Sequence, residues 1–319
     1  IGTENDRLRE GYKMKIMVFD VGGTEIKYSV MDEQMHRTNS GAVPTPQDTQ
    51  AQFLDAVYRL YAPHKDEVSG IAMALPGFVD NRTGYVSNGG ALLYNTATPV
   101  GQLLAEKCGC PVILENDGKA AAMAELANGA LKDCCNAAVF IIGTGVGGGI
   151  IANGQLVRGV HFTAGEYSFV NTNAEAWDAP DQNMACQCST SNLLKWYRAR
   201  KALPEDAPLD GRSFFAAANA GEPEALEVLR RFCHAVAVQI YNLTVLLDVE
   251  KVAIGGGISK QPLLLESLRS AYDGLYASRA GQAYMEGLPR CQIVPCAFSS
   301  EANQVGVAAA YFEAMQKKC

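Results

Sequence analysis

Two glycine-rich turns constrain the fold of this chain more than any other feature of its sequence. The first is Asp20-Val21-Gly22-Gly23-Thr24, and the second is Gly143-Thr144-Gly145-Val146-Gly147-Gly148-Gly149. Each turn follows an apolar run that is typical of a buried strand, at 16–19 and at 137–142. The residues after each turn are typical of a second strand, so both turns predict β-hairpins.

Glycine-rich turns at strand ends are typical of phosphate-binding loops. Glycine can take a positive φ and let backbone N–H groups approach an anion, and the Thr24 and Thr144 hydroxyls add donors. A plain turn would use the same glycines, so either turn alone is weak evidence. Neither turn has the Walker pattern, and neither is followed by the helix of a dinucleotide-binding motif. Two such hairpins predict two domains that close on one nucleotide, and Asp20 at the end of its strand predicts Mg²⁺ beside the phosphates.

The composition indicates a globular protein with two domains. The 319 residues are 48% hydrophobic and carry a net charge of −7, which permits a large core and argues against a nucleic-acid partner. No apolar run reaches the length of a membrane span and no signal segment opens the sequence, so we expect a cytoplasmic protein without a membrane partner. We expect most of the ten cysteines to be reduced thiols. The polar residues 1–13 predict a tail or an expression remnant.

The predicted elements repeat in two halves. After the first hairpin we expect helices at 49–62, 100–107 and 117–129, and strands at 68–75 and 111–114. After the second hairpin we expect a strand at 156–157, helices at 191–201, 223–247, 263–272 and 301–317, and strands at 251–254 and 292–295. Duplicated sheet domains with hairpins at equivalent places predict a cleft between the domains.

Six motifs, in order, resemble the ROK family of sugar kinases and its repressor relatives, within the actin-like, hexokinase-like ATPase superfamily. The match runs from about Met14 to the C-terminus. It rests on the two hairpins with Lys27, Leu75-Pro76-Gly77, Glu115-Asn116-Asp117, Arg158-Gly159 with Ala164-Gly165-Glu166, and Gly255-Gly256-Gly257-Ile258.

The resemblance implies an α/β fold of two actin-like (ribonuclease H-like) domains, with mixed sheets flanked by helices and an interdomain cleft. We place the smaller N-terminal domain at 14–117 plus the C-terminal helix 301–319, and the larger domain at 118–300. The resemblance also implies a homodimer.

The resemblance further implies an ATP-dependent kinase that phosphorylates a sugar hydroxyl with Asp117 as the general base. The partner would be a small-molecule sugar or glycoside, bound by Gly77, Asn116, Asp117 and Glu166. The cofactors would be ATP and Mg²⁺, with the metal at Asp20 through the phosphates. The implied ATP-binding residues are Asp20, Gly22, Gly23, Thr24, Lys27, Gly143, Thr144, Gly145, Gly147, Gly255, Gly256 and Gly257.

A simpler interpretation exists for several of these residues. Asp is a preferred N-cap, so local sequence alone favours Asp117 as a helix cap. The amide of neighbouring Asn116 suits a pair of sugar hydroxyls, and a carboxylate at a strand-to-helix junction can accept the proton of an attacking hydroxyl. Catalysis is therefore the leading hypothesis for Asp117. By the same reasoning Glu166 alone would be a solvated loop carboxylate, and Gly255 to Gly257 a plain turn.

The chain departs from the family pattern at two places. Phe169 stands where most members have a His three residues after the Glu. Cys186-Gln187-Cys188 lacks the following glycines and the third cysteine of the family's zinc cluster, and two cysteines do not supply the four ligands of structural zinc, so we predict none. This pattern resembles the zinc-free β-glucoside kinases of the family. We therefore expect phosphorylation at the 6-hydroxyl of a hexose or β-glucoside, with room for an aglycone beside Phe169.

The alternative function is a sugar-binding sensor or transcriptional-regulator relative without kinase activity. Repressor relatives carry an N-terminal helix-turn-helix domain, whereas thirteen polar residues precede Met14 here. A degenerate site would have little reason to retain Asp20, Asn116 and Asp117 together, so the three residues favour a kinase.

Overall fold

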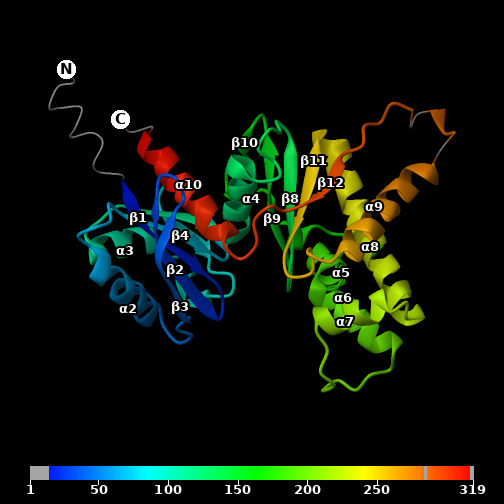
Figure 1. Cartoon of the computed structure of the whole chain (residues 1–319), viewed down its shortest axis with the longest axis horizontal. Helices are drawn as coiled ribbons and strands as arrows, with labels where there is room; N and C mark the ends of the chain where they lie inside the picture. Colours follow the sequence, from blue (N-terminus) through cyan, green and yellow to red (C-terminus); the bar gives the residue numbers. More distant parts are fainter. Residues whose placement is uncertain (1–13, 280, 284–285, 317–319) are drawn as a thin grey trace. The chain divides into compact units, whose positions relative to one another are not determined.

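The computed structural model describes residues 14–279, 281–283 and 286–316. The predicted tail at 1–13 lies outside these residues. Contacts divide the chain into two compact units (Figure 1). Unit 1 holds the residues up to Ala127, the segment Arg158–Thr163 and the residues from Ser300 onward, and unit 2 holds Asn128–Val157 and Ala164–Ser299. All but the last residue of the helix that begins at Asp117 belongs to unit 1. The sequence-based domain boundary lies at the start of this helix, between residues 117 and 118, and stays a prediction.

Unit 1 is built on a five-stranded mixed sheet in the order β3-β2-β1-β4-β7. The strands β1, β2 and β3 are antiparallel, and β4 and β7 join β1 in parallel. The strand bounds are β1 Lys15–Val21, β2 Glu25–Asp32, β3 Arg37–Pro44, β4 Ile71–Leu75 and β7 Val112–Asn116, and a small hairpin adds β5 Phe78–Asp80 and β6 Tyr85–Asn88.

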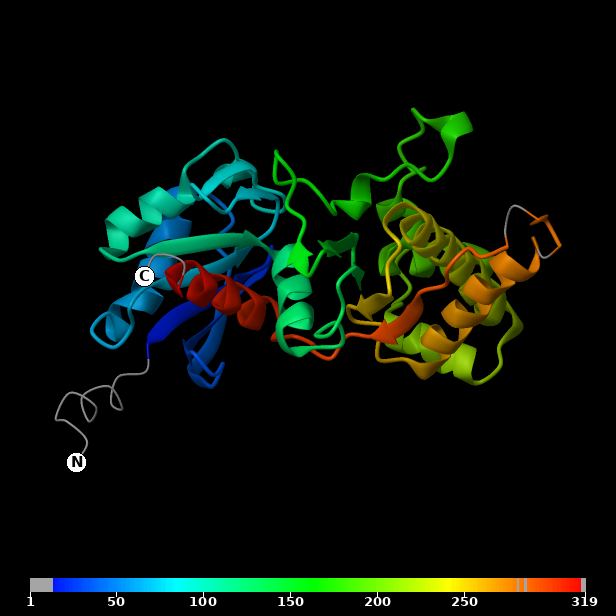
Figure 2. The same ribbon diagram turned by 90° about the horizontal axis from the view of Figure 1, so that it is seen from above.

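Helices of unit 1 bury both faces of this sheet. Alternate residues of β1, such as Met17 and Phe19, belong to a core that includes Phe53 and Leu104 of α2 and α3. Residues between them, such as Val18, are also fully buried, and α10 contacts β1, β4 and β7 (Figures 1 and 2). The helix bounds are α2 Gln50–Tyr61, α3 Val100–Cys108, α4 Asp117–Asn128 and α10 Ala302–Gln316, with 3-10 turns η1 Ala62–His64 and η2 Leu93–Asn95.

Unit 2 repeats the sheet of unit 1. Its order is β10-β9-β8-β11-β12, with β8, β9 and β10 antiparallel and β11 and β12 parallel to β8. One apolar core joins this sheet to the helices of the unit. The bounds are β8 Ala137–Ile142, β9 Val146–Ala152, β10 Gln155–Leu156, β11 Lys251–Gly255, β12 Gln292–Pro295, η3 Tyr167–Phe169, η4 Ala174–Ala176, α5 Met184–Cys188, α6 Thr190–Arg200, α7 Gly211–Asn219, α8 Pro223–Leu247 and α9 Pro262–Ala277.

The structure confirms the α/β fold of two mixed-sheet units with equivalent hairpins. It adds elements that the sequence did not predict, namely β3, the β5–β6 hairpin, α5 and α7. Most residues of β3 are exposed, so the strand lacks the alternating apolar pattern that reveals strands. The start of α7 did carry a signal, because Asp210 and Ser213 form a capping box. Among the described residues, no helix has the length and apolar character needed to span a membrane.

The two helices α4 and α10 are in backbone contact inside unit 1. A Cβ atom on Gly306 of α10 would overlap the carbonyl oxygen of Ala120 in α4. Glycine is therefore required at this position, because any side chain would push the helices apart.

We expect Gly306→Ala to lower the free energy of unfolding by about 1–3 kcal/mol through this overlap. The matched control is Gly274→Ala on α9, where no atom lies within 4 Å of the added Cβ; its higher helix propensity should raise stability by up to about 1 kcal/mol. Urea denaturation followed by circular dichroism measures both. Equal stability of Gly306→Ala and the unsubstituted protein would contradict the close packing of α4 on α10.

Candidate active site

The β1–β2 hairpin in unit 1 is the first of the two predicted phosphate loops. Asp20 on β1 lies opposite Lys27 on β2. The turn between them is supported from the segment after β3, because the Thr45 hydroxyl donates to the carbonyl oxygen of Gly22 at 2.8 Å and the Gln47 amide donates to that of Gly23 at 2.7 Å. With these carbonyls held from one side, the turn has a fixed backbone conformation before any ligand binds.

The Asp20 carboxylate has a partner that the sequence did not predict. Asn303, in the first turn of α10, donates from Nδ2 to Asp20 Oδ1 at 2.9 Å. Asp20 is 9% exposed, and burial raises its pKa, while the hydrogen bond from Asn303 and the charge of Lys27 oppose that rise. The available signal was the polar pair Asn303-Gln304 at the start of a helix whose next eight residues are uncharged and mostly apolar. Gln304 is itself buried and accepts from the Ser29 hydroxyl at 3.1 Å.

The structure brings Gly77, Asn116 and Asp117 together at the carboxyl ends of β4 and β7. Asn116 ends β7 and Asp117 begins α4. The Asn116 amide donates to the carbonyl oxygen of Gly77 at 2.9 Å, and its Oδ1 accepts from the backbone N–H of Lys119 at 3.0 Å. Asn116 therefore caps α4, and the interpretation of Asp117 as that cap is wrong. Asp117 lies half-buried in the first helical turn, where its Oδ1 accepts from the N–H of Gly118 at 2.7 Å.

Among the glycines of the two predicted phosphate turns, Gly148 takes the positive φ that glycine permits, at +141°. Gly22, Gly23, Gly143 and Gly145 all lie outside the left-handed region. At Gly143 no atom lies within 4 Å of an added Cβ, whereas at other glycines of the two turns the absence of a side chain matters for space. At Gly145, for example, a Cβ atom would lie 2.9 Å from the Ser168 hydroxyl.

Positive φ is also found at equivalent strand ends of the two units. Gly77 follows β4 with φ +95°, and Gly256 follows β11 with φ +96°. A Cβ atom on Gly77 would overlap the carbonyl oxygen of Asn88, and one on Gly256 would overlap that of Ile142. Both positions therefore require glycine for its conformation and for a close backbone contact.

The β8–β9 hairpin and the glycines after β11 lie together in unit 2. Ile141 is the register partner of Gly255 across the parallel β8–β11 pair, and Gly256 contacts Ile142, the residue before Gly143. The Gly143 N–H donates to the carbonyl oxygen of Gly145 at 3.0 Å and closes the turn. The predicted ATP-binding residues at 143–147 and at 255–257 are thus in contact through their backbones.

Glu166 and Phe169 lie on a short segment packed against β9. The backbone of Gly165 approaches that of Gly149, where an added Cβ would be 3.3 Å from the Gly149 Cα. The buried Tyr167 donates its hydroxyl to the Gly149 carbonyl at 3.0 Å. Glu166 is half-buried at the start of η3, and the Phe169 side chain is 71% exposed. The structure therefore fixes the backbone beside Glu166 and leaves an aromatic ring at the surface three residues later.

Comparisons with known proteins agree with this arrangement. The sequence profile of the ROK family matches residues 16–316. This chain belongs to the ROK family. A β-glucoside kinase from Listeria innocua serovar 6a is 31% identical over 258 residues, which cover 80% of this chain and 87% of the relative.

Solved structures resemble this ROK protein over nearly its whole length. A ROK family protein from Streptococcus pneumoniae TIGR4 in complex with sucrose has a TM-score of 0.83 and 28% identity, covering 95% of this chain and 100% of that one. A ROK family glucokinase from Streptomyces griseus in complex with glucose and AMPPNP has a TM-score of 0.76 and 25% identity, covering 93% and 98%. These similarities confirm the expected fold class.

The cysteines that resemble the start of the family's zinc cluster lie in α5 of this ROK protein. Cys188 is 1% exposed, and burial raises the pKa of its thiol to about 12, so the thiol is protonated at neutral pH. The Cys186 thiol donates to the carbonyl oxygen of Pro180 at 3.7 Å. Within the described part of the chain, no group of three or more His, Cys, Asp or Glu side chains has an arrangement suited to a metal ion. The lack of structural zinc stays a prediction.

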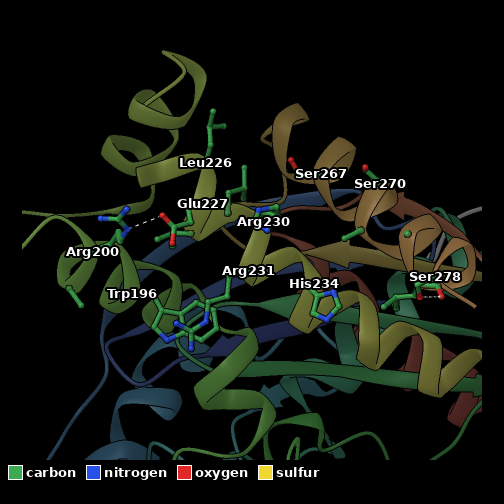
Figure 3. Close-up of a pocket in the computed structure, with 16 residues that line it drawn as sticks. Trp196, Arg200, Leu226, Glu227, Arg230, Arg231, His234, Ser267, Ser270 and Ser278 are labelled. Atoms are coloured by element: carbon green, nitrogen blue, oxygen red, sulfur yellow. Dashed lines mark hydrogen bonds and ion pairs between the residues drawn. The ribbon is translucent and has the colours of Figure 1, made fainter. Parts of the chain in front are cut away.

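A groove of about 1140 Å³ lies in unit 2 of this ROK protein, among α6, α8 and α9 (Figure 3). Arg231 stacks on the Trp196 ring at 3.8 Å, and Arg200 pairs with Glu227 at 2.8 Å. None of the residues predicted to bind sugar or ATP line this groove. The groove therefore shares no residues with the candidate active site.

Proposed function

We propose that this protein transfers the γ-phosphoryl group of ATP to a hydroxyl of a sugar. Membership of the ROK family, the relative named β-glucoside kinase and the glucokinase bound to glucose and AMPPNP support the proposal. The predicted phosphate turns at 20–24 and 143–147 are both backbone hairpins braced by their surroundings. Preorganised backbone donors are suited to the charge that develops on phosphoryl oxygens.

The observation that carries this proposal is the geometry at the start of α4. Asn116 satisfies the helix cap and holds the Gly77 carbonyl, so the Asp117 carboxylate need not perform the capping role. Asp117 would accept the proton of the sugar hydroxyl as the hydroxyl oxygen bonds to the γ-phosphorus. The bond from that phosphorus to the β–γ bridging oxygen would break, and ADP would leave with the electron pair.

The surroundings of Asp20 fit the Mg²⁺ ion that ATP brings. Carboxylate oxygen is the ligand type that Mg²⁺ prefers. Asn303 donates its hydrogen bond to the Oδ1 oxygen of Asp20. Asp20 would hold the ion directly or through its water, and the ion would neutralise phosphate charge when bound. Asn303 fixes the orientation of the carboxylate, and Lys27 on the facing strand adds positive charge near the phosphates.

For the substrate we propose a hexose or β-glucoside phosphorylated at its 6-hydroxyl, held by Asn116, Asp117 and Glu166. The exposed Phe169 ring, three residues after Glu166, supports a site that accepts an aglycone, because aromatic faces offer apolar contact to sugar rings and aryl groups. The relative named β-glucoside kinase and the family structure bound to sucrose, a disaccharide, point in the same direction. By family resemblance we also propose a homodimer without structural zinc.

We expect Asp117→Asn to lower kcat by about 10²- to 10⁴-fold, because the amide cannot accept the hydroxyl proton. Glucose or glucoside binding, measured by calorimetry, should stay within about threefold, since the amide retains hydrogen-bonding atoms. The matched control is Asp66→Asn, which neutralises an exposed aspartate and should leave kcat unchanged. Nearly full activity of Asp117→Asn would refute the base role.

A coupled assay of ADP release on glucose, mannose, fructose, cellobiose and aryl β-glucosides tests the substrate class. We expect kcat/KM on the glucosides to exceed that on glucose, and Phe169→His to shift the ratio toward glucose by about tenfold or more. Leu246→Ala is the control, since it truncates another exposed apolar side chain, 77% exposed near the end of α8. Equal or better rates on free glucose in the unsubstituted protein would exclude the glucoside preference and leave the kinase activity standing.

A further inference from the structure

A buried ion pair lies next to the Asn116–Asp117 junction. Glu115, the residue before Asn116 in β7, has none of its surface exposed. Its Oε2 accepts from Nε of Arg158 at 2.9 Å. A buried carboxylate is costly as an anion unless a cation or strong donors compensate for the lost water. Arg158 is therefore the group on which the charge of Glu115 chiefly depends.

The Glu115 carboxylate is hydrogen-bonded to the backbone of the candidate site. Its Oε1 accepts from the N–H of Asn116 at 3.1 Å, and its Oε2 also accepts from the Asn81 amide at 3.4 Å. Burial raises the pKa of Glu115, while Arg158, the Asn116 N–H and the charge of Lys119 on α4 oppose the rise. Glu115 thus connects a guanidinium on one side to the Asn116 backbone on the other.

The Arg158 guanidinium also reaches the helix that carries Asp117. Its Nη2 donates to the Met123 sulfur at 3.4 Å, and Met123 lies in α4. One planar group therefore contacts β7 through Glu115 and α4 through Met123. β7 and α4 meet at Asp117. The guanidinium therefore restrains the position of α4 relative to β7 at this junction.

The segment that supplies Arg158 is itself fixed in unit 1. Arg158–Thr163 belongs to unit 1, although the residues before and after it belong to unit 2. Phe162 in this segment is 8% exposed with φ +60°, a conformation uncommon for a bulky residue and retained only where the surroundings hold it. The Arg82 guanidinium lies over its ring at 4.6 Å. The two residues after β5 thus contact both parts of this arrangement. Asn81 donates to Glu115, and Arg82 stacks on Phe162.

From these contacts we propose that Glu115 and Arg158 are positioning residues for phosphoryl transfer. The pair sets the orientation of Asn116 and Asp117 through the Asn116 backbone and the β7–α4 junction, and neither residue touches the substrate. The inference rests on the proposed kinase activity. It differs from a purely stabilising role because it predicts a change in kcat for protein that remains folded.

The test compares Arg158→Met with the matched control Arg59→Met in steady-state assays across pH. Arg158→Met should lower kcat by about 10- to 100-fold through misplacement of Asp117, with the KM for ATP within about twofold. Arg59→Met removes a guanidinium from an exposed position in the last turn of α2, in the same unit, and should keep kcat within about twofold and its pH profile unchanged.

The pH profile separates positioning from stability. Without Arg158, Lys119 is the remaining cation that opposes the raised pKa of Glu115, so Glu115 becomes protonated at higher pH. The acidic limb of kcat should therefore move to higher pH in Arg158→Met. In the double variant with Glu115→Gln that displacement should vanish, because Gln does not titrate. If Arg158→Met does not fold, Arg158→Lys replaces it, with kcat expected about fivefold or more below the unsubstituted protein.

The outcomes are distinct. The inference is supported if Arg158→Met loses kcat and its acidic limb moves to higher pH, and if this displacement is absent in the double variant with Glu115→Gln. Folded Arg158→Met, or Arg158→Lys in its place, with unchanged kcat overturns it and leaves the proposed function standing. In Arg158→Met, a loss of kcat without any displacement of the limb also overturns it, since that is the result of a general structural disturbance. Absence of turnover on every sugar in the unsubstituted protein overturns the proposed function, and the inference with it.

Discussion

Asn116 makes three hydrogen bonds in unit 1 at the point where β7 ends and α4 begins. Its side-chain oxygen caps α4 through the Lys119 N–H, its side-chain nitrogen holds the Gly77 carbonyl after β4, and its own backbone N–H donates to Glu115. A cap of this kind contributes about 1 kcal/mol to a helix. Its larger consequence is geometric, because Asp117 follows directly and takes its position from Asn116.

The duplicated sheets explain why the candidate residues occur where they do. In both units an antiparallel hairpin precedes two strands that run parallel to its first strand. The carboxyl ends of parallel strands meet at one edge, so the residues after β4 and β7 become neighbours in unit 1, as do those after β8 and β11 in unit 2. The chemistry then diverges at equivalent positions. Asn116 ends the last strand of one unit and Asp117 follows it, whereas Cys296 follows the last strand of the other unit.

Local patterns in the sequence were enough to predict the hairpins, most helices and the strand-to-helix junction at Asp117. Each of these depends on residues close together in the chain, such as the apolar run 137–142 and the glycines that follow it. The sequence also placed Gly77 and Asn116 in one site by family resemblance, and the structure shows them hydrogen-bonded. Their roles toward sugar remain predictions.

Other features of the site depend on contacts that no local pattern encodes. Asn303 bonds to Asp20 across 283 residues, and Arg158 pairs with Glu115 across 43. The Arg158-Gly159 motif was visible in the sequence, but its partner could not be identified without the path of the segment through unit 1. Gly148 of the second phosphate turn has a positive φ, whereas Gly22, Gly23, Gly143 and Gly145 do not. The conformation at Gly22 and Gly23 depends on Thr45 and Gln47, which lie on another part of the chain.

The most direct test of the central claim is a crystal structure of the protein with its preferred sugar and a non-hydrolysable ATP analogue. The claim predicts a carboxylate oxygen of Asp117 within hydrogen-bonding distance, about 2.6–3.2 Å, of the hydroxyl that is phosphorylated, with that hydroxyl in line with the γ-phosphorus. A sugar whose reactive hydroxyl faces another side chain, with Asp117 bonded only to protein groups, would contradict the account.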